Sequence, residues 1–413
     1  MLEYSLNIKT RNNKYSVHKL ILFLFGVFSF FLGTGYEKLT VYSLILLTVF
    51  SFLSFDVKKV NLKKEVVIFY LFFLIILIYS LVFKEYKYIE RNISFFLFPL
   101  LMLNINKELI KKAFIKNIIF YSFSLGLLFY SFRIIIYYLV TGTAVETGAP
   151  LIWYSFYDLK RVLFSNNELG QIFHSVYYSV YSICSVLFLI FNLKYVKHKW
   201  LSCLLIFFHI IFVFIAASRI SYITITILIL IFIIKIKNKK ISVSLLLITV
   251  LSFFCFSKLV LNNEYSYLYH KFVEDVPYAV DFRINLWSNS CKIFFNNLKG
   301  IGFKNFHEEL HILNSTTLPQ GPLGSEGSKY NAHNLFLEFF CALGMIGGFY
   351  FIFVIRAIFK RALEKKNETL FYLIVTLSIS FLTESFLLRQ YGIIFFMFFV
   401  TLFWNNKIEK TIS

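Results

Sequence analysis

The chain alternates long apolar runs with short polar stretches, and this alternation dominates the sequence. Most of the runs reach the ~17–25 residues that a helix needs to cross the hydrocarbon core of a bilayer. The pattern predicts an all-α integral membrane protein with about twelve transmembrane helices, of which the fourth and twelfth are short for that role. The runs are 20–35, 39–55, 66–83, 92–104, 118–140, 171–193, 201–217, 220–235, 242–260, 334–359, 370–387 and 392–404.

The composition supports lipid as the main solvent. Of 413 residues, 58% are hydrophobic and 21% aromatic, which is more apolar surface than a soluble core can hide. The net charge of +20 comes in short clusters between the runs, a pattern typical of polytopic membrane proteins and not of nucleic-acid binding. The five cysteines show no CxxC spacing, so neither a disulfide framework nor a thiolate zinc site is indicated.

The distribution of basic residues predicts the orientation. With the N-terminus inside, the inner segments hold most of the 42 Lys and Arg residues, so both termini are expected in the cytoplasm and the chain in the plasma (inner) membrane. No small-residue cleavage site follows the first run, which we expect to be a retained helix and not a signal peptide. Residues 1–260 then form helices 1–9, residues 261–333 a long extracytoplasmic loop, and residues 334–413 the last three helices and a cytoplasmic tail.

The long loop contains one segment with a clear helical pattern, residues 281–298. Glycines 300 and 302 are expected to end this helix. Because its apolar residues share one face, we expect the helix to lie on the outer membrane surface with that face down. The face consists of Ile284, Trp287, Cys291, Phe294 and Leu298.

Three side chains near the outer boundary could carry chemistry. Arg219 follows a short connection between two runs, Arg283 stands near the start of the surface helix, and His333 stands where a polar stretch meets the tenth run. The arginines could grip an anion, and the imidazole could act as a base near neutral pH. Each also has a simpler interpretation: a snorkelling arginine, a solvated surface charge and an interfacial histidine without a task.

Four further polar residues could support such a site. Asn334 and Glu338 are four residues apart and share a face at the start of the tenth run. Glu384 and Arg389 flank the outer end of the eleventh run. An acid inside an apolar segment is costly, so Glu384 should have a partner or a role, and pairing with Arg389 is the simpler alternative. Three glycines later in the tenth run predict a close helix contact: Gly344, Gly347 and Gly348.

The sequence HEELH at His307–His311 matches the H-E-x-x-H pattern of zinc proteases. That chemistry needs a helix that brings both histidines to one face and a third ligand. A turn-rich stretch follows, and no nearby segment offers the third ligand. We therefore expect no metal here, and an exposed acidic and histidine-rich patch instead.

Three stretches in this order resemble the O-antigen ligase and Wzy-type polysaccharide polymerase superfamily. They are "ASRISYITITILIL" around Arg219, "FRINLWSNSCKIFFNNLKGIGFKNF" around Arg283 and "AHNLFLEFFCALGMIGG" around His333. Members look similar in having an SR step before a span, an arginine-led segment ending in GxG, a long outer loop, and HN opening the next span. The resemblance covers roughly residues 205–350.

The resemblance implies inverting glycosyl transfer without metal or other cofactor. The donor and acceptor would be glycans on undecaprenyl pyrophosphate, with a chain-length regulator as a further partner. Arg219 and Arg283 would hold the pyrophosphate, and His333 would activate the acceptor hydroxyl. A repeat-unit polymerase is favoured over a ligase that transfers the glycan to lipid A core. A flippase for the same lipid carrier and a membrane zinc protease are the alternatives from other classes.

Overall fold

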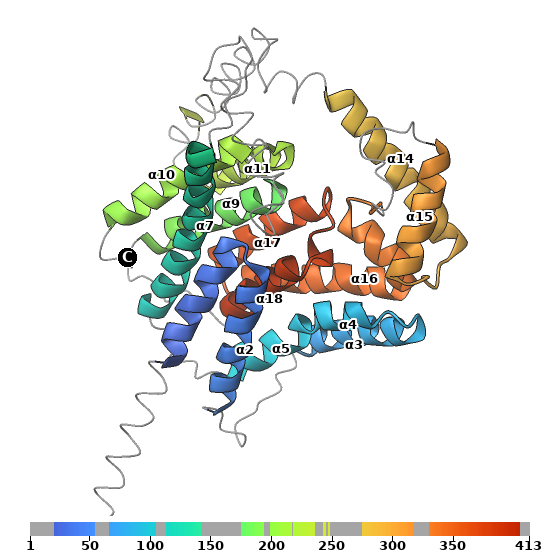
Figure 1. Cartoon of the computed structure of the whole chain (residues 1–413), viewed down its shortest axis with the longest axis horizontal. Helices are drawn as coiled ribbons and strands as arrows, with labels where there is room; N and C mark the ends of the chain where they lie inside the picture. Colours follow the sequence, from blue (N-terminus) through green and yellow to red (C-terminus); the bar gives the residue numbers. More distant parts are fainter. Residues whose placement is uncertain are drawn as a thin grey trace, which may run out of the picture.

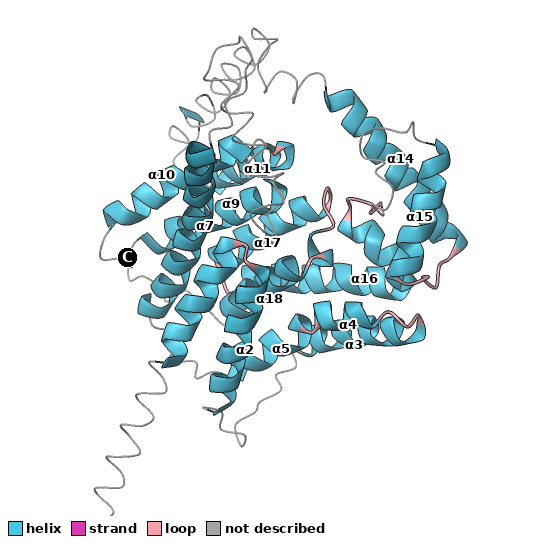
Figure 2. Ribbon diagram, viewed as in Figure 1, coloured by secondary structure: helices cyan, strands magenta, loops and turns pink. Residues whose placement is uncertain are grey.

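The computed structural model describes residues 20–53, 66–104, 113–141, 175–193, 199–216, 218–235, 275–317 and 330–404, together with residues 243, 244 and 247. Within this part of the chain every regular element is a helix, as Figure 2 shows. A first helix spans Leu20–Thr34. The others are α2 (Glu37–Leu53), α3 (Val67–Val82), α4 (Tyr86–Asn92), α5 (Ser94–Asn104), α7 (Ala113–Thr141), α9 (Ser175–Asn192), α10 (Lys199–Ala216), α11 (Arg219–Lys235), α14 (Asp275–Asn296), α15 (Phe303–Thr317), α16 (Leu335–Glu364), α17 (Glu368–Phe381), the short 3₁₀ helix η5 (Phe386–Leu388) and α18 (Gln390–Trp404).

The apolar runs of the sequence coincide with helices of the structure, which confirms the all-α class. Run 242–260 is the exception, because nearly all of it lies outside the described residues. Among the described residues, α9, α10 and α16 are long and apolar enough to cross a membrane, and four further apolar helices are shorter. The count of twelve spans, the cytoplasmic termini and the outer loop stay predictions.

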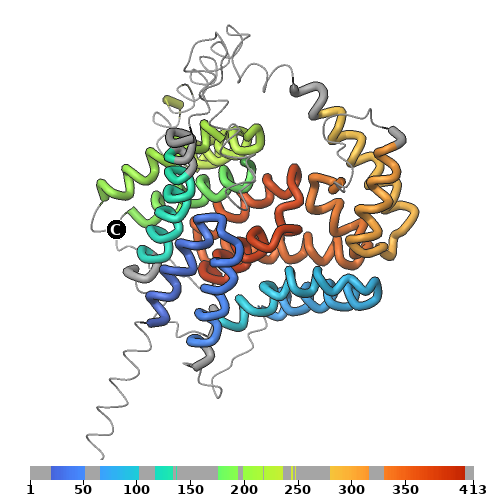
Figure 3. Tube along the Cα trace, in the orientation of Figure 1, coloured from blue at the N-terminus to red at the C-terminus, as the bar shows by residue number. Residues whose placement is uncertain are grey.

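The C-terminal helices form the centre of the bundle. Helix α18 packs against α5, α16 and α17 (Figures 1 and 3). Every residue of α18 from Gly392 to Trp404 is buried, as expected for a helix that is apolar on all sides and surrounded by others. The site described below lies in the segments that lead into α16 and out of α17.

The outer helices expose apolar side chains, which supports a membrane location. On α10, Phe207, Ile211 and Phe214 are 58%, 36% and 48% exposed and follow one another at helical spacing. The opposite face of α10 buries Leu205 and Phe212 against the bundle. Such an exposed apolar face is expected for a helix in contact with lipid, because exposure of these side chains to water would be unfavourable.

Helix α14 is amphipathic, and its buried face overlaps only in part with the one that the sequence predicts. Its buried apolar side chains are Leu286 and Ile293, which pack in a cluster with Phe306 and Leu310 of α15. Ile284 of the predicted face is 53% exposed, and Leu298 is 47% exposed. Trp287 and Phe294 of the predicted face pack against the same cluster, because α15 and α16 lie beside the helix. That α14 lies on the membrane surface stays a prediction.

Helix α16 is broken at Gly344, whose φ is +66° and ψ −169°. The break exposes backbone groups of α16, and the turn between α14 and α15 satisfies them. Ile301 and Gly302 donate their N–H groups to the carbonyls of residues 341 and 342 at 3.2 and 2.9 Å, and the N–H of residue 345 donates to Leu298 at 2.9 Å. The predicted close contact at Gly344 is therefore made with a turn and not with a helix.

The approach of the turn to Gly344 leaves no room for a side chain. A Cβ on Gly344 would lie 2.4 Å from the carbonyl carbon of Lys299, and a Cβ on Gly300 would lie 2.4 Å from the backbone N of Gly344. Both glycines have positive φ, which other residues adopt only with strain. Gly300 and Gly302 follow the end of α14, as predicted, and their φ of +82° turns the chain into α15.

A buried acid anchors the start of α15 to the hairpin between α3 and α4. The carboxylate of Glu85 accepts hydrogen bonds from the backbone N–H groups of Phe303 at 2.9 Å and Lys304 at 2.6 Å. Burial raises the pKa of the Glu85 carboxyl, while the backbone donors at Lys304 and Phe303 act to lower it. The anchor fixes α15, and with it α14, against the bundle.

Candidate active site

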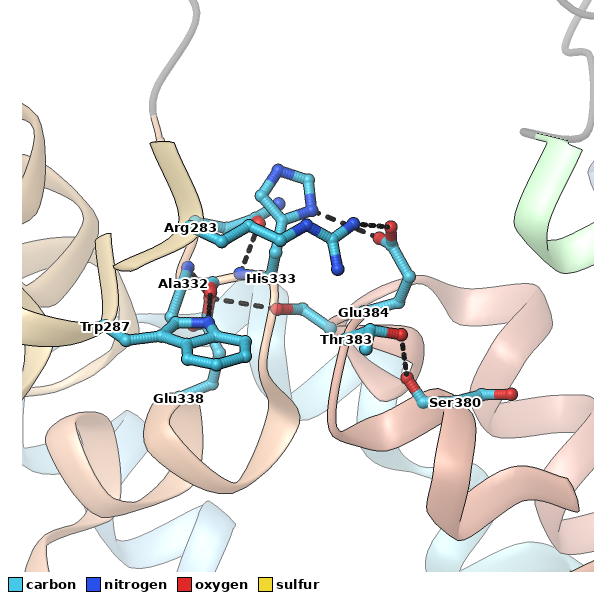
Figure 4. Close-up of polar contacts among 10 residues, drawn as sticks. Arg283, Trp287, Ala332, His333, Glu338, Ser380, Thr383 and Glu384 are labelled. Carbon is cyan, nitrogen blue, oxygen red and sulfur yellow. Dashed lines mark hydrogen bonds and ion pairs between the residues drawn. The ribbon is translucent and has the colours of Figure 1, made fainter. Parts of the chain in front are cut away.

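Two of the predicted residues, Arg283 and His333, converge on the carboxylate of a third, Glu384 (Figure 4). His333 Nδ1 lies 3.2 Å from Oε2 of Glu384, and Nη2 of Arg283 lies 3.3 Å from Oε1. His333 lies in the segment before α16, Arg283 in α14 and Glu384 in the segment after α17. The structure thus brings Glu384 together with residues that are 51 and 101 positions away in sequence.

The exposure of the three side chains suits a binding site. Glu384 is only 8% exposed, whereas Arg283 and His333 are 33% and 34% exposed. The acid is therefore a buried anchor, and the other two side chains leave part of their surface accessible to solvent. An ionised carboxylate only accepts hydrogen bonds, so contact with Glu384 favours the His333 tautomer with its proton on Nδ1.

The backbone at His333 has an unusual conformation that surrounding contacts hold. Its φ is +46°, a left-handed value that is uncommon for a residue other than glycine. The His333 N–H donates to Oδ1 of Asn331 at 3.0 Å. Trp287 of α14 donates its indole N–H to the carbonyl of Ala332 at 3.0 Å. Strain of this kind persists only where neighbouring contacts determine the backbone, and it often marks functional sites.

Asn334 has a structural task as the N-cap of α16. Its Oδ1 accepts hydrogen bonds from the N–H groups of Phe336 at 3.0 Å and Leu337 at 3.2 Å. These bonds satisfy two of the donors that a helix start leaves unpaired. The cap fixes where α16 begins and therefore where the preceding residue, His333, stands.

Glu338, in the first turn of α16, is fully buried and holds three donors. Its Oε1 accepts from the backbone N–H of Ala332 at 2.7 Å and from the hydroxyl of Ser385 at 3.1 Å. Its Oε2 lies 2.9 Å from Nε2 of His307. The sequence placed Glu338 correctly beside Asn334 at the start of the helix, but it gave no sign of these partners.

The HEELH segment differs from its predicted state. It lies on a helix, α15, and His307 is 13% exposed and bound to Glu338, so it is not part of an exposed patch. His311 packs its ring against Tyr330, with centroids 5.3 Å apart. No group of three metal-ligating side chains occurs among the described residues. Phe303, Phe306 and Leu310 stand at helical spacing, and this signal could have identified the helix.

Arg219 begins α11 and lies at the same end of the bundle as Glu384. The two helices α11 and α17 pack together and run in opposite directions. Nζ of Lys235, at the end of α11, lies 4.5 Å from the ring centroid of Phe371, near the start of α17. The first residue of α11 is therefore near the end of α17, which Glu384 follows. Arg389, which follows η5, is exposed, whereas Glu384 forms ion pairs with Arg283 and His333.

A comparison with protein-family models matches the part of the chain that holds most of this site. Residues 202–352 match the family model described as O-antigen ligase. This match supports the resemblance to the O-antigen ligase and Wzy-type superfamily that the sequence motifs indicate. The matched O-antigen ligase domain includes Arg219, Arg283 and His333, whereas Glu384 lies beyond it. Members of this family are membrane-associated, glycosyltransferase-like enzymes. No curated protein matches the sequence of the chain.

Proposed function

We propose that the protein polymerises oligosaccharide repeat units carried on undecaprenyl pyrophosphate, by inverting glycosyl transfer at the outer face of the plasma membrane. The observation that carries the proposal is the convergence of Arg283 and His333 on Glu384 at the end of an apolar bundle. An arginine fork next to a base suits a reaction in which a diphosphate leaves and a hydroxyl attacks.

The bond changes assign a task to each side chain. An acceptor hydroxyl oxygen attacks the anomeric carbon of the donor, and the bond from that carbon to the pyrophosphate oxygen breaks. The pyrophosphate leaves with the bonding electrons, and the hydroxyl proton passes to Nε2 of His333. Attack opposite the leaving group inverts the anomeric configuration.

Glu384 makes His333 a competent base. Its contact at Nδ1 holds the proton there and leaves the lone pair of Nε2 available for the acceptor hydroxyl. The negative charge of the carboxylate also stabilises the imidazolium that forms when Nε2 takes the proton.

The arginines stabilise the leaving group. Arg283 offers a planar set of donors to the pyrophosphate oxygens, and Arg219 adds a second guanidinium from the same end of the bundle. A donor aimed at the departing oxygen contributes more in the transition state than in the ground state, because charge accumulates there as the bond breaks.

Purified protein in detergent, given a lipid-linked repeat unit, tests the proposal. We expect stepwise chain growth, and loss of about 100–1,000-fold in rate for Arg283→Ala. Near-wild-type growth by both His333→Ala and Arg283→Ala would reject the assignment. Lysine at position 219 should recover only part of the loss caused by alanine there, because lysine lacks the planar fork.

The description of the matched family favours one second candidate, a ligase that transfers the finished glycan to lipid A core. The same arginines and base would serve it, since only the acceptor differs. Supplying lipid A core and a lipid-linked repeat unit as competing acceptors separates the two. Glycan on lipid A core, without longer lipid-linked chains, would establish the ligase.

A further inference from the structure

The buried pair of His307 and Glu338 has no part in the bond changes above, yet it contacts both segments of the site. The Glu338 carboxylate accepts from Ala332, the residue before His333, and from Ser385, the residue after Glu384. One carboxylate oxygen, Oε1, therefore joins the two segments that carry the catalytic histidine and its acid partner (Figure 4).

His307 supplies the third donor and reaches Glu338 from a different element. Its Nε2 lies 2.9 Å from Oε2 of Glu338, across 31 positions of sequence and from helix α15 of the long loop. Glu338 is fully buried, and a buried carboxylate is costly unless donors surround it. Removing His307 would leave Oε2 without this donor and favour movement of the carboxylate.

We propose that His307 and Glu338 are positioning residues that hold the His333–Glu384 pair at hydrogen-bond distance. The inference rests on the proposed function for its meaning in catalysis, but its geometry stands without it. The HEELH motif thereby has a role, since its first histidine, His307, donates to the buried acid Glu338 of α16. The left-handed backbone of His333 requires such support, because a strained backbone persists only where neighbouring contacts determine it.

The histidine NMR spectrum of the whole protein, labelled with ¹⁵N-histidine in detergent, tests the inference. The His333 signals are assigned by their loss in His333→Gln. In the wild type we expect the tautomer with the proton on Nδ1. His307→Phe keeps a ring of similar size without the donor, and Ser385→Ala removes another donor with a smaller change. Both variants should loosen the contact between His333 and Glu384, and should therefore move His333 toward the tautomer with the proton on Nε2.

Two variants control for a merely structural effect. His307→Gln keeps an N–H donor and should restore most of the wild-type signal. His311→Phe places the same substitution in the same motif, at a histidine that packs on Tyr330, and should leave the His333 signal unchanged. An unaltered His333 signal in both His307→Phe and Ser385→Ala would overturn the inference, and so would an equal change in His311→Phe.

Kinetics add a second readout. His307→Phe should lower kcat about 10-fold, while KM for the lipid-linked repeat unit stays within about twofold, because neither positioning residue touches the substrate. A rise in KM with unchanged kcat would contradict a positioning role. If the wild type transfers no glycan, the proposed function fails, and the NMR comparison alone decides whether the pair positions His333.

Discussion

Replacing Glu384 by glutamine changes two contacts at once with little change in size. In the wild type, the Glu384 carboxylate lies 3.2 Å from Nδ1 of His333 and 3.3 Å from Nη2 of Arg283. A glutamine amide can donate its N–H to Nδ1, which forces the histidine proton onto Nε2 and removes the base. The amide also carries no charge for the guanidinium or for the developing imidazolium.

The size of the effect follows from the exposure of the partners. General base catalysis contributes about 10²–10⁴-fold, and a fully buried triad carboxylate lies at the upper end of that range. His333 and Arg283 are 34% and 33% exposed, so solvent screens part of the interaction. We therefore expect Glu384→Gln to lower the transfer rate about 100-fold, equivalent to about 2.7 kcal/mol of transition-state stabilisation.

Single-turnover glycan transfer measures this rate apart from product release. Glu384→Asp keeps the charge with a shorter side chain and should lose less activity than glutamine. Glu368→Gln is the matched control, because Glu368 is an exposed acid at the opposite end of α17. A Glu384→Gln rate within about threefold of the wild type, in protein shown to be folded, would refute the role given to the carboxylate.

Four other predictions address the clamp, the fold and the orientation. Arg283→Lys keeps the charge and loses the planar set of donors, so its single-turnover transfer rate should lie between that of Arg283→Ala and that of the wild type. Gly344→Ala forces a Cβ to within 2.4 Å of the Lys299 backbone at positive φ and should destabilise the protein by about 2 kcal/mol or more, seen as a lower thermal midpoint in detergent. Burial raises the pKa of the Glu85 carboxyl above its ordinary value of 4.5, so the folded state binds the proton more tightly than the unfolded state. The stability of the protein should therefore fall as pH rises from about 4.5 through the raised pKa. Glu85→Gln, which cannot titrate, should show a shallower decline of the thermal midpoint over this pH range. A cysteine at Ser325 should react with an impermeant thiol reagent in intact cells or spheroplasts, and protection there with labelling of Lys240→Cys would invert the orientation.

The helices could be predicted because their signal is local. Length and apolarity of a run suffice for a helix when lipid or protein covers every face, and α18 illustrates this since it is buried along nearly all its length. The break in α16 has no such local signal. A glycine in an apolar helix is common, and only the turn at 298–302 shows that Gly344 leaves the helical conformation.

The site could be predicted only in part, for a similar reason. Glu384 could be identified because an acid inside an apolar run is costly and needs an explanation. Arg283 stands near the start of a predicted helix, where an anion would bind, and His333 stands where a polar stretch meets an apolar run. The sequence offered Arg389 as the simpler alternative partner of Glu384, because the two residues flank the end of one run. The structure instead gives partners 101 and 51 positions away, and no periodicity encodes such distances.

Buried carboxylates explain how a long loop is held against an apolar bundle. The chain has only 22 acidic residues, and three of them, Glu85, Glu338 and Glu384, are buried where α14 or α15 meets the bundle. Each accepts donors from distant segments, and a buried acid is tolerated only when such donors are in place. Buried acids thus orient Arg283 and His333 in the absence of a substrate, which in the proposed reaction would lower the reorganisation that catalysis requires.

The same arrangement constrains how a diphosphate could enter. Arg283 already has an anionic partner, so a pyrophosphate must compete with Glu384 for the guanidinium or engage those of its N–H groups that point away from the acid. Since Oε1 contacts Arg283 and Oε2 contacts His333, the arginine can turn toward the ligand while the histidine keeps its contact. We therefore expect substrate binding to lengthen the Arg283–Glu384 distance and leave the His333–Glu384 distance unchanged, so the base stays oriented while the clamp closes on the leaving group.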